Sequence, residues 1–204
     1  DWDLGPALAF WEYRYNATTS GNPGRLFVHN DIMYIPRSSG GAYLYSTDGT
    51  TWTASNRTGD DALADGFATH NGVLHKFLKP AKHQAMPNSA ATGINGGTAW
   101  NSADQIGDTS FDIQEVLSVL GSLAFCKEDG IYTIDSGSNI RPLIPDLARL
   151  FYASNGFGSS VWGQNILYPV ASGNVWGLVD GQPTELTPSL QQGKPMEVLG
   201  SEQP

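Results

Sequence analysis

The chain has 204 residues, of which 15% are charged, whereas soluble domains usually have about 25% charged residues. Its formal net charge of -9 excludes nucleic acid as the main partner, because no basic stripe is available to neutralise phosphates. The 24 Gly and 12 Pro residues indicate many turns and favour an all-β chain over a helical bundle.

The chain opens with an aromatic segment, residues 1–24. It contains Trp2, Trp11 and Tyr13, and such rings usually bury large areas rather than decorate a solvated tail. We therefore expect a contact strand or part of a blade here, with these three aromatic residues as candidate contact residues. Because the sequence starts with Asp rather than Met, we also expect it to be processed or part of a longer protein.

Four strand-turn-strand units then repeat along the chain. Residues 27–34 and 68–75 match position by position, with an Asn-Asp or Asn-Gly pair between two apolar runs. Such pairs tolerate the positive φ angles of a two-residue hairpin turn. Residues 118–125 and 161–168 are looser copies. Spacings of 41, 50 and 43 residues separate the equivalent positions Ile32, Val73, Leu123 and Ile166. This period is typical of a propeller blade.

A third and a fourth strand are expected after each hairpin. The expected third strands are 42–46, 98–102, 130–134 and 174–179. The expected fourth strands are 51–55, a strand near Phe111, 140–144 and 183–187. Four strands per repeat describe a blade. The sequence therefore predicts a β-propeller or partial propeller with four four-stranded antiparallel blades in residues 25–190, followed by a C-terminal segment or truncated blade at 191–204.

The second repeat is interrupted by residues 79–97, which have little periodicity and contain Pro, Asn and Gly. This pattern predicts a long loop between the second and third strands of that repeat. Loops of this length often carry function, so Lys79, Lys82 and His83 are candidate contact residues. The only helical character lies at 146–151, where an acidic residue follows Pro145.

The single cysteine, Cys126, excludes an internal disulfide and a cysteine-based zinc site. Its apolar neighbours predict a buried position. His70 and His75 flank a hairpin turn, with His83 beyond them, and neutral imidazoles are common zinc or copper ligands. However, His75 aligns with bulky aromatic residues in the other repeats, which favours packing. We expect no metal and no cofactor.

Residues 46–52, Ser-Thr-Asp-Gly-Thr-Thr-Trp, resemble the Asp-box of sialidase-like propellers, with one residue missing between Asp and Gly. In that family the motif has a structural role. The resemblance implies that the Asp48 carboxylate accepts hydrogen bonds from the turn at Gly49 and that Trp52 covers the blade core.

A second resemblance is carried by residues 106–110 and 127–135, a Gly-Asp turn and a Lys-Glu-Asp-Gly-Ile-Tyr hairpin. They look like the repeats of β-propellers found among bacteriophage virion and tail-associated proteins. The resemblance implies a virion or extracellular location. It also implies that the partners are other virion subunits or further copies of this chain.

Catalytic residues are not evident. A sialidase-like enzyme needs three converging arginines, and other glycosidases need two facing carboxylates. The arginines match no motif, and the carboxylate candidates, by residue type alone, are Asp60, Asp61, Asp65, Glu128 and Asp129. We therefore expect a non-enzymatic structural or binding propeller engaged in virion assembly or attachment.

Two alternatives remain for the function: a sialidase-like Asp-box hydrolase, and a propeller that binds a surface glycan without catalysis. A glycan-binding propeller would expose tryptophan rings on one face, with Trp11, Trp100, Trp162 and Trp176 as candidates, although packing between blades is the preferred role of these rings. No membrane insertion is expected, because no stretch approaches 18 consecutive apolar residues.

Overall fold

The computed structural model describes residues 22–38, 41–119, 122–127, 129–134, 140–144, 160–162, 165–169, 175–179 and 182–185. These residues form four four-stranded antiparallel sheets and one two-stranded sheet. A short 3-10 helix, η1 (Gly59–Ala62), precedes the second four-stranded sheet. The prediction of an all-β chain is confirmed for this part of the protein.

Each four-stranded sheet joins its strands in sequence order. The first sheet contains β2 (Phe27–His29), β3 (Ile32–Ile35), β5 (Leu44–Ser46) and β6 (Thr53–Ala54). The second contains β7 (Gly66–His70), β8 (Val73–Leu78), β9 (Lys82–Ala85) and β10 (Asp104–Gln105). The third contains β11 (Ile113–Val119), β12 (Ser122–Lys127), β13 (Gly130–Ile134) and β14 (Ile140–Ile144). The fourth contains β15 (Ser160–Trp162), β16 (Asn165–Pro169), β17 (Val175–Val179) and β18 (Gln182–Glu185). The small sheet pairs β1 (Asn22–Pro23) with β4 (Arg37–Ser38).

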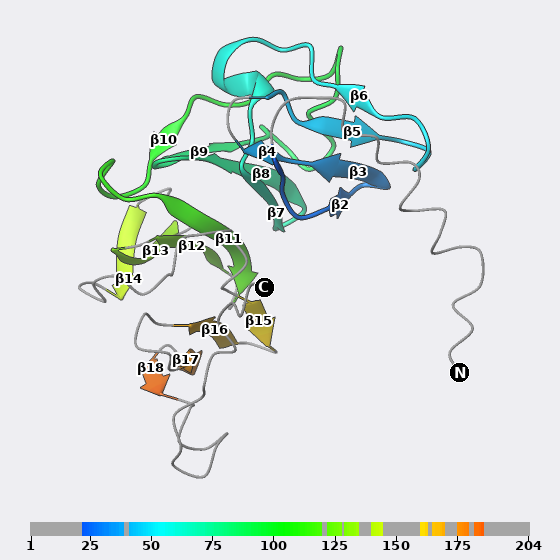
Figure 1. Cartoon of the computed structure of the whole chain (residues 1–204). Coiled ribbons are helices and arrows are strands. Elements are labelled where there is room, and N and C mark those ends of the chain that lie inside the picture. The colour runs from blue at the N-terminus through cyan, green and yellow to red at the C-terminus, as the bar shows by residue number, and fades with distance from the viewer. Residues whose placement is uncertain are drawn as a thin grey trace, which may run out of the picture.

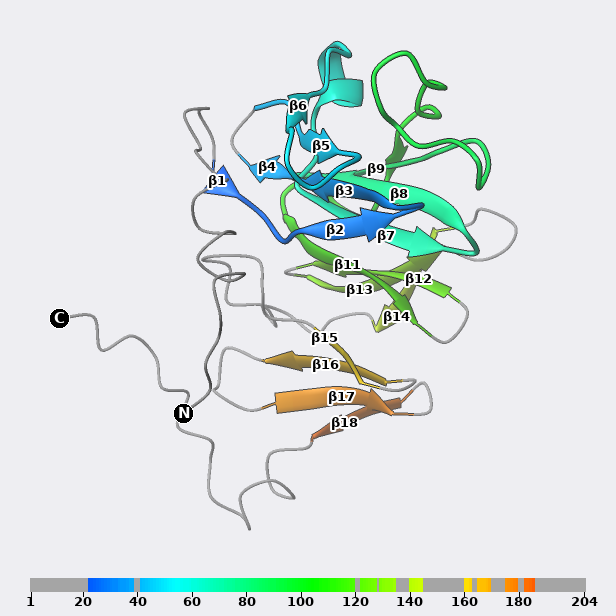
Figure 2. The same ribbon diagram turned by 90° about the vertical axis from the view of Figure 1, so that its right-hand side faces the viewer.

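The four sheets follow one another in chain order, each beside its predecessor (Figure 1 and Figure 2). Neighbouring sheets contact each other through their first strands, β2 with β7, β7 with β11, and β11 with β15. Because every sheet turns its first strand toward the same side, the arrangement is propeller-like.

The first two hairpin turns have the geometry that the sequence predicted. In the β2–β3 hairpin, Asn30 and Asp31 have φ angles of 48° and 61°. In the β7–β8 hairpin, Asn71 and Gly72 have φ angles of 49° and 75°. Two consecutive positive φ angles define the turn type that matches the twist of paired strands.

Two hydrophobic cores lie between neighbouring sheets. Between the first and second sheets, Tyr34, Tyr43 and Phe67 pack together with Trp100. The second core joins the second and third sheets, and it contains Ala68, Phe77, Ile106, Ile113, Val116, Leu123 and Phe125. Cys126 is buried, as predicted, and its sulfur is not part of a disulfide. Trp100 is only 6% exposed, so its preferred packing role is confirmed and it offers no ring to a glycan.

Two buried lysines hold the segments that lead into the first strands. Lys76 Nζ donates hydrogen bonds to the carbonyl oxygens of Asp60 and Leu63, both at 2.7 Å. In the third sheet, Lys127 Nζ donates to Asp108 O at 2.9 Å and Phe111 O at 2.6 Å. Each ammonium thereby donates to two backbone carbonyl groups of the connecting segment, and such groups need partners when they are buried. These lysine contacts were not predicted from the sequence.

The long loop of the second repeat connects the third and fourth strands, and not the second and third strands as expected. The third strand is β9 (Lys82–Ala85) and the fourth is β10 (Asp104–Gln105), so the long connection is 86–103, between the third and fourth strands. The predicted third strand at 98–102 and fourth strand near Phe111 are wrong. Trp100 suggested a strand because it is a core residue, but a loop carries it into the core.

In the other three sheets, the third strands β5, β13 and β17 and the fourth strands β6, β14 and β18 all overlap the expected ranges. The predicted helical turn at 146–151, the segment 1–21 and the segment 186–204 lie outside the described residues. The proposed boundaries at 24 and 190 therefore remain predictions. In the described part of the chain, no helix is long and apolar enough to cross a membrane.

Candidate functional site

A pocket of about 610 Å³ lies between the second and third sheets. The second sheet and its long loop provide most of its polar side chains, and the third sheet provides Ser122, Leu123 and Ile134. The described residues that line it are His70, Asn71, Val73, His75, His83, Ala85, Met86, Asn101, Ser102, Asp104, Ser122, Leu123 and Ile134.

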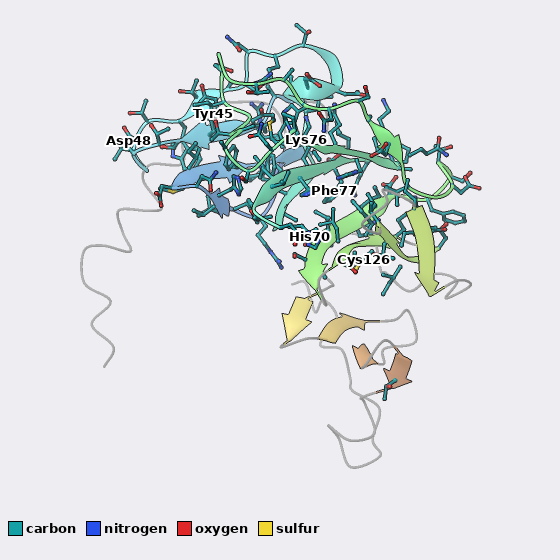
Figure 3. The ribbon with its side chains drawn as sticks, turned by 180° about the vertical axis from the view of Figure 1, so that it is seen from behind. Tyr45, Asp48, His70, Lys76, Phe77 and Cys126 are labelled. Atoms are coloured by element: carbon teal, nitrogen blue, oxygen red, sulfur yellow. The ribbon has the colours of Figure 1, made fainter. Side chains whose placement is uncertain are left out.

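Strand pairing explains why the polar residues gather on one face. His83 pairs with Phe77 on β8 and with Asp104 on β10, and directly opposed residues point to the same side of a sheet. His75 lies two residues before Phe77 and therefore shares that face. Because Phe77 packs in the core with the third sheet, His75, His83 and Asp104 face the third sheet as well. Figure 3 places His70 at the end of β7, where the two sheets meet.

His75 and His83 form a stacked, hydrogen-bonded pair. Their ring centroids are 5.3 Å apart with an interplanar angle of 14°, and His75 Nδ1 lies 3.0 Å from His83 Nε2. The His83 ring also packs edge-on against Phe125, with centroids 5.0 Å apart. Contacts on both sides hold His83 in one orientation.

His70 closes the pocket near the β7–β8 turn. Its Nδ1 lies 3.0 Å from Ser118 Oγ on β11, and Asn71 Nδ2 donates to its Nε2 over 3.1 Å. An imidazole that accepts at Nε2 carries its proton at Nδ1 when neutral. His70 therefore donates to Ser118 and links the second sheet to the third.

Burial keeps the histidines neutral near pH 7. It lowers the pKa of His75 to about 3, with a further decrease caused by the neighbouring His83. Burial also lowers the pKa of His83 to about 4 and shifts the pKa of His70 downward. Neutral imidazoles offer both a donor and an acceptor nitrogen, so this pocket can form hydrogen bonds of either direction.

One polar atom of the pocket has no partner. His83 is 3% exposed, and its Nδ1 makes no hydrogen bond. The carboxylate of Asp104, whose side chain is 57% exposed, places Oδ2 3.5 Å from this nitrogen. Buried polar atoms are nearly always hydrogen-bonded, and an exception at a pocket is typical of a site that receives a ligand or water.

The predicted contact residues have different positions. His83 lies in β9 rather than in a loop, and it lines the pocket. Lys79 Nζ lies 3.6 Å from Asp112 Oδ2, and Lys82 Nζ lies 2.6 Å from Asp60 Oδ2. Neither lysine lines the pocket. Trp2, Trp11 and Tyr13 fall outside the described residues, so their contact roles remain predictions.

Asp48 lies at the edge of the first sheet, far from His70 (Figure 3). Its Oδ1 accepts hydrogen bonds from the backbone amides of Thr50 and Thr51, both at 2.7 Å. These bonds hold the pKa of the carboxyl well below its usual range. Gly49 has a φ of 70°, and Trp52 is half-buried. The arrangement stabilises a turn and takes no part in the pocket.

The three arginine side chains that the structure describes do not converge. Arg25 lies 3.8 Å from a Glu115 carboxylate oxygen, Arg37 donates to Ala42 O, and Arg57 donates to carbonyls of the long loop. Among the pocket-lining side chains that the structure describes, Asp104 is the only carboxylate. The pocket therefore lacks the arginine triad of a sialidase and the carboxylate pair of other glycosidases. In the described part of the chain, no group of three His, Cys, Asp or Glu side chains is arranged to hold a metal ion.

Asp104, Asn101 and Ser102 were not predicted from the sequence as site residues. A signal for the neighbouring strand existed in the alternation of His83 and Ala85, which share one face of β9. It was not recognised, because a four-residue strand of Lys, His, Gln and Ala has no β-branched or aromatic residue.

No family model and no curated protein matches this sequence. Solved structures match by fold, with 7 to 11% sequence identity. A streptogramin B lyase has a TM-score of 0.59 and 11% identity over 81% of this chain and 54% of its own. Virginiamycin B lyase from Staphylococcus aureus has a TM-score of 0.58 and 10% identity, over 83% of this chain and 56% of its own. The chain thus spans about half the length of these lyases.

A third similar structure is the extracellular domain of a one-component system from B. thetaiotaomicron. It has a TM-score of 0.59 and 7% identity, and the match covers 85% of this chain and 24% of that one. Such low identities establish the β-propeller-like fold alone. The comparison also corrects the prediction of a non-enzymatic protein, which was made because no catalytic motif was matched: streptogramin B lyases are enzymes, and their fold is similar.

Proposed function

We propose that this chain supplies consecutive blades of an extracellular β-propeller and binds a small ligand in the pocket between its second and third sheets. Each four-stranded sheet would be one blade. The propeller-like arrangement of the sheets supports this assignment. The extracellular location is supported by the similarity to the extracellular domain of a one-component system.

The observation that carries the proposal is the unpaired His83 Nδ1 at a pocket of about 610 Å³. Pockets of roughly 300–1,000 Å³ with a few convergent polar groups are typical small-molecule sites. Here the polar groups lie on a rigid sheet, and the imidazole of His83 is fixed by His75 and Phe125. A preorganised site of this kind loses little conformational entropy on binding.

A second proposal concerns the setting of the propeller. We propose that it belongs to a virion or tail assembly, because the two segments that resemble phage propellers meet in space. Lys127 Nζ bonds to Asp108 O, and a Cβ on Gly107 would lie 2.7 Å from the Tyr132 ring. The Gly-Asp turn and the hairpin thus form one packed unit. Its test is cryo-electron microscopy of particles carrying the epitope-tagged chain, and a chain that is consistently absent from particles would contradict it.

The ligand proposal is tested by histidine NMR. The protein contains four histidines, of which His70, His75 and His83 line the pocket and His29 does not. We expect at least one ligand from a panel of neutral sugars, organic acids and organic amines to shift the ¹⁵N signals of the three pocket imidazoles. The His29 signal serves as an internal control and should stay in place. If no compound shifts the pocket signals selectively, the proposal is wrong.

A further inference from the structure

We infer that the pocket between the second and third sheets selects a small organic cation, namely a protonated amine carried on an apolar body. This inference rests on the proposed function, since it names the class of ligand for the same pocket. It is drawn from the charges, the hydrogen-bond directions and the walls of the pocket.

The charge of the lining favours a cation. Among the described side chains that line it, Asp104 is the only one with a formal charge when the histidines are neutral, and none is Lys or Arg. The whole chain carries a net charge of -9. An anion would therefore meet repulsion without any cationic partner, whereas a cation gains a charge-assisted hydrogen bond to the carboxylate.

The free nitrogen of His83 can serve as an acceptor. A neutral imidazole has one donor and one acceptor nitrogen. When His83 Nε2 donates to His75 Nδ1, which lies 3.0 Å away, His83 Nδ1 carries a lone pair. An ammonium placed between this nitrogen and Asp104 favours that tautomer, because an ammonium has only donors.

This lone pair and the Asp104 carboxylate form a two-acceptor site. The two acceptor atoms are 3.5 Å apart, and an ammonium has three N–H donors directed away from one nitrogen. One ammonium can donate to both at ordinary N–H···O and N–H···N distances of about 2.7–3.2 Å. Asp104 lies on the two-residue strand β10 and its side chain is 57% exposed, so its carboxylate can rotate to admit the ligand.

The remaining walls suit a hydrocarbon body. Leu123 and Ile134 come from the third sheet, and Met86 and Ala85 come from the second. These side chains have no strong hydrogen-bonding group, and methionine adapts its shape to different apolar ligands. A ligand with an ammonium at one end and an apolar ring or chain at the other fits both parts of the pocket.

The test compares three molecules of similar shape: benzylamine, benzyl alcohol and benzoate. We expect calorimetric titration at pH 7 to show that benzylamine binds at least about 10-fold more tightly than the other two, since a hydrogen bond to a charged group contributes about 1.5–3 kcal/mol. In ¹⁵N spectra, benzylamine should move His83 Nδ1 toward the hydrogen-bonded range and leave His29 unchanged.

The variant Asp104→Asn removes the charge from an exposed side chain and should weaken benzylamine binding at least about 10-fold. Asp112→Asn is the matched control, because it removes an exposed carboxylate that is paired with Lys79 outside the pocket, and it should bind benzylamine like the parent.

Equal affinities for the amine and the alcohol, or an unchanged affinity in Asp104→Asn, would overturn the inference. If sugars or acids still shift the pocket histidines while benzylamine does not, the ligand class is wrong but the proposed site stands. If no compound of any class shifts them, the proposed function itself fails.

Discussion

His29 Nδ1 lies 2.8 Å from Thr69 Oγ1 and thereby joins the end of β2 to the adjacent strand β7. The same contact recurs one sheet further on, where His70 at the end of β7 lies 3.0 Å from Ser118 on β11. In both cases the last residue of one first strand bonds to the penultimate residue of the next first strand. The histidines thus act as repeated links between sheets, which explains their equivalent positions in the sequence.

The two links should differ in their contribution to stability. His29 is 4% exposed and its Nε2 has no partner, so Thr69→Val would leave both ring nitrogens unpaired in the interior. We expect a loss of about 1–2 kcal/mol in the free energy of unfolding. Ser118 is exposed, so water can replace its hydroxyl in Ser118→Ala, and the loss should be below about 0.5 kcal/mol. Urea denaturation measures both, and equal losses would argue against this difference in burial.

Lys76 is expected to be essential for the second sheet. Its ammonium is fully buried, lies 4.5 Å from the centroid of the Trp100 ring and bonds to two loop carbonyls. Lys76→Met keeps most of the length of the side chain but leaves the carbonyl of Leu63 without its donor, while Asp60 O retains only the amide of Leu63. We expect the free energy of unfolding to fall by about 2–4 kcal/mol.

The matched control for this substitution is Lys82→Met. Lys82 pairs with Asp60 over 2.6 Å, but its side chain is 50% exposed. Exposed ion pairs contribute little, so the loss should be within about 1 kcal/mol. Thermal unfolding followed by circular dichroism distinguishes the two variants. A Lys76→Met protein as stable as Lys82→Met would show that the buried ammonium is dispensable.

Glu115 should make the protein less stable as the pH rises. Burial raises its pKa from 4.5 to about 7, although Arg25 opposes this shift. Between these two values the folded state binds more protons than the unfolded state, so the free energy of unfolding falls as pH increases from about 4.5 to 7, by up to about 3 kcal/mol. The buried histidines have lowered pKa values and act in the opposite direction. The difference between the parent and Glu115→Gln isolates the carboxyl.

In Glu115→Gln the side chain cannot ionise, so this variant should gain stability relative to the parent as the pH rises toward 7 and above. Denaturant titrations at pH 5, 6, 7 and 8 measure this difference. The prediction would be contradicted if the stability difference between the two proteins were the same at every pH.

Local sequence signals predicted the fold well because its turns have specific chemical requirements. Asn30-Asp31 and Asn71-Gly72 adopt the positive φ angles that their composition favours, and the aromatic strand around Tyr45 pairs as expected. The polar strands β9 and β10 were missed because their position depends on partners. The loop 86–103, which packs against the first sheet, brings Asp104 beside its partner His83.

The pocket could not be predicted for the same reason. The sequence placed His70 and His75 on either side of a turn and considered a metal site or packing, but the role of His83 depends on its register with Asp104. Burial then determines the charge of the imidazoles, and burial is a property of the assembled sheets. Sequence motifs identified which residue types were present but did not determine how deeply each side chain would be buried.

The long loop 86–103 is held by tyrosines of the first sheet, and this attachment should support the pocket. Tyr34 Oη donates to Thr92 O and Tyr43 Oη donates to Gly93 O. The loop then continues to Asn101 and Ser102, which line the pocket. The double variant Tyr34→Phe/Tyr43→Phe keeps the rings but leaves two carbonyls without donors, which destabilises the attached loop by about 1–3 kcal/mol for each group that stays buried.

We therefore expect this double variant to be cut faster by thermolysin within the loop under native conditions, because local opening controls such cleavage. The His83 ¹⁵N signal should also shift or broaden, whereas the His29 signal, which reports on the link between β2 and β7, should not. Tyr132→Phe is the control, since it removes a hydroxyl that bonds to Asp129 in the third sheet. Equal cleavage rates in the double variant, the control and the parent would show that the tyrosine hydroxyls do not hold the loop, and that the pocket is shaped by the sheets alone.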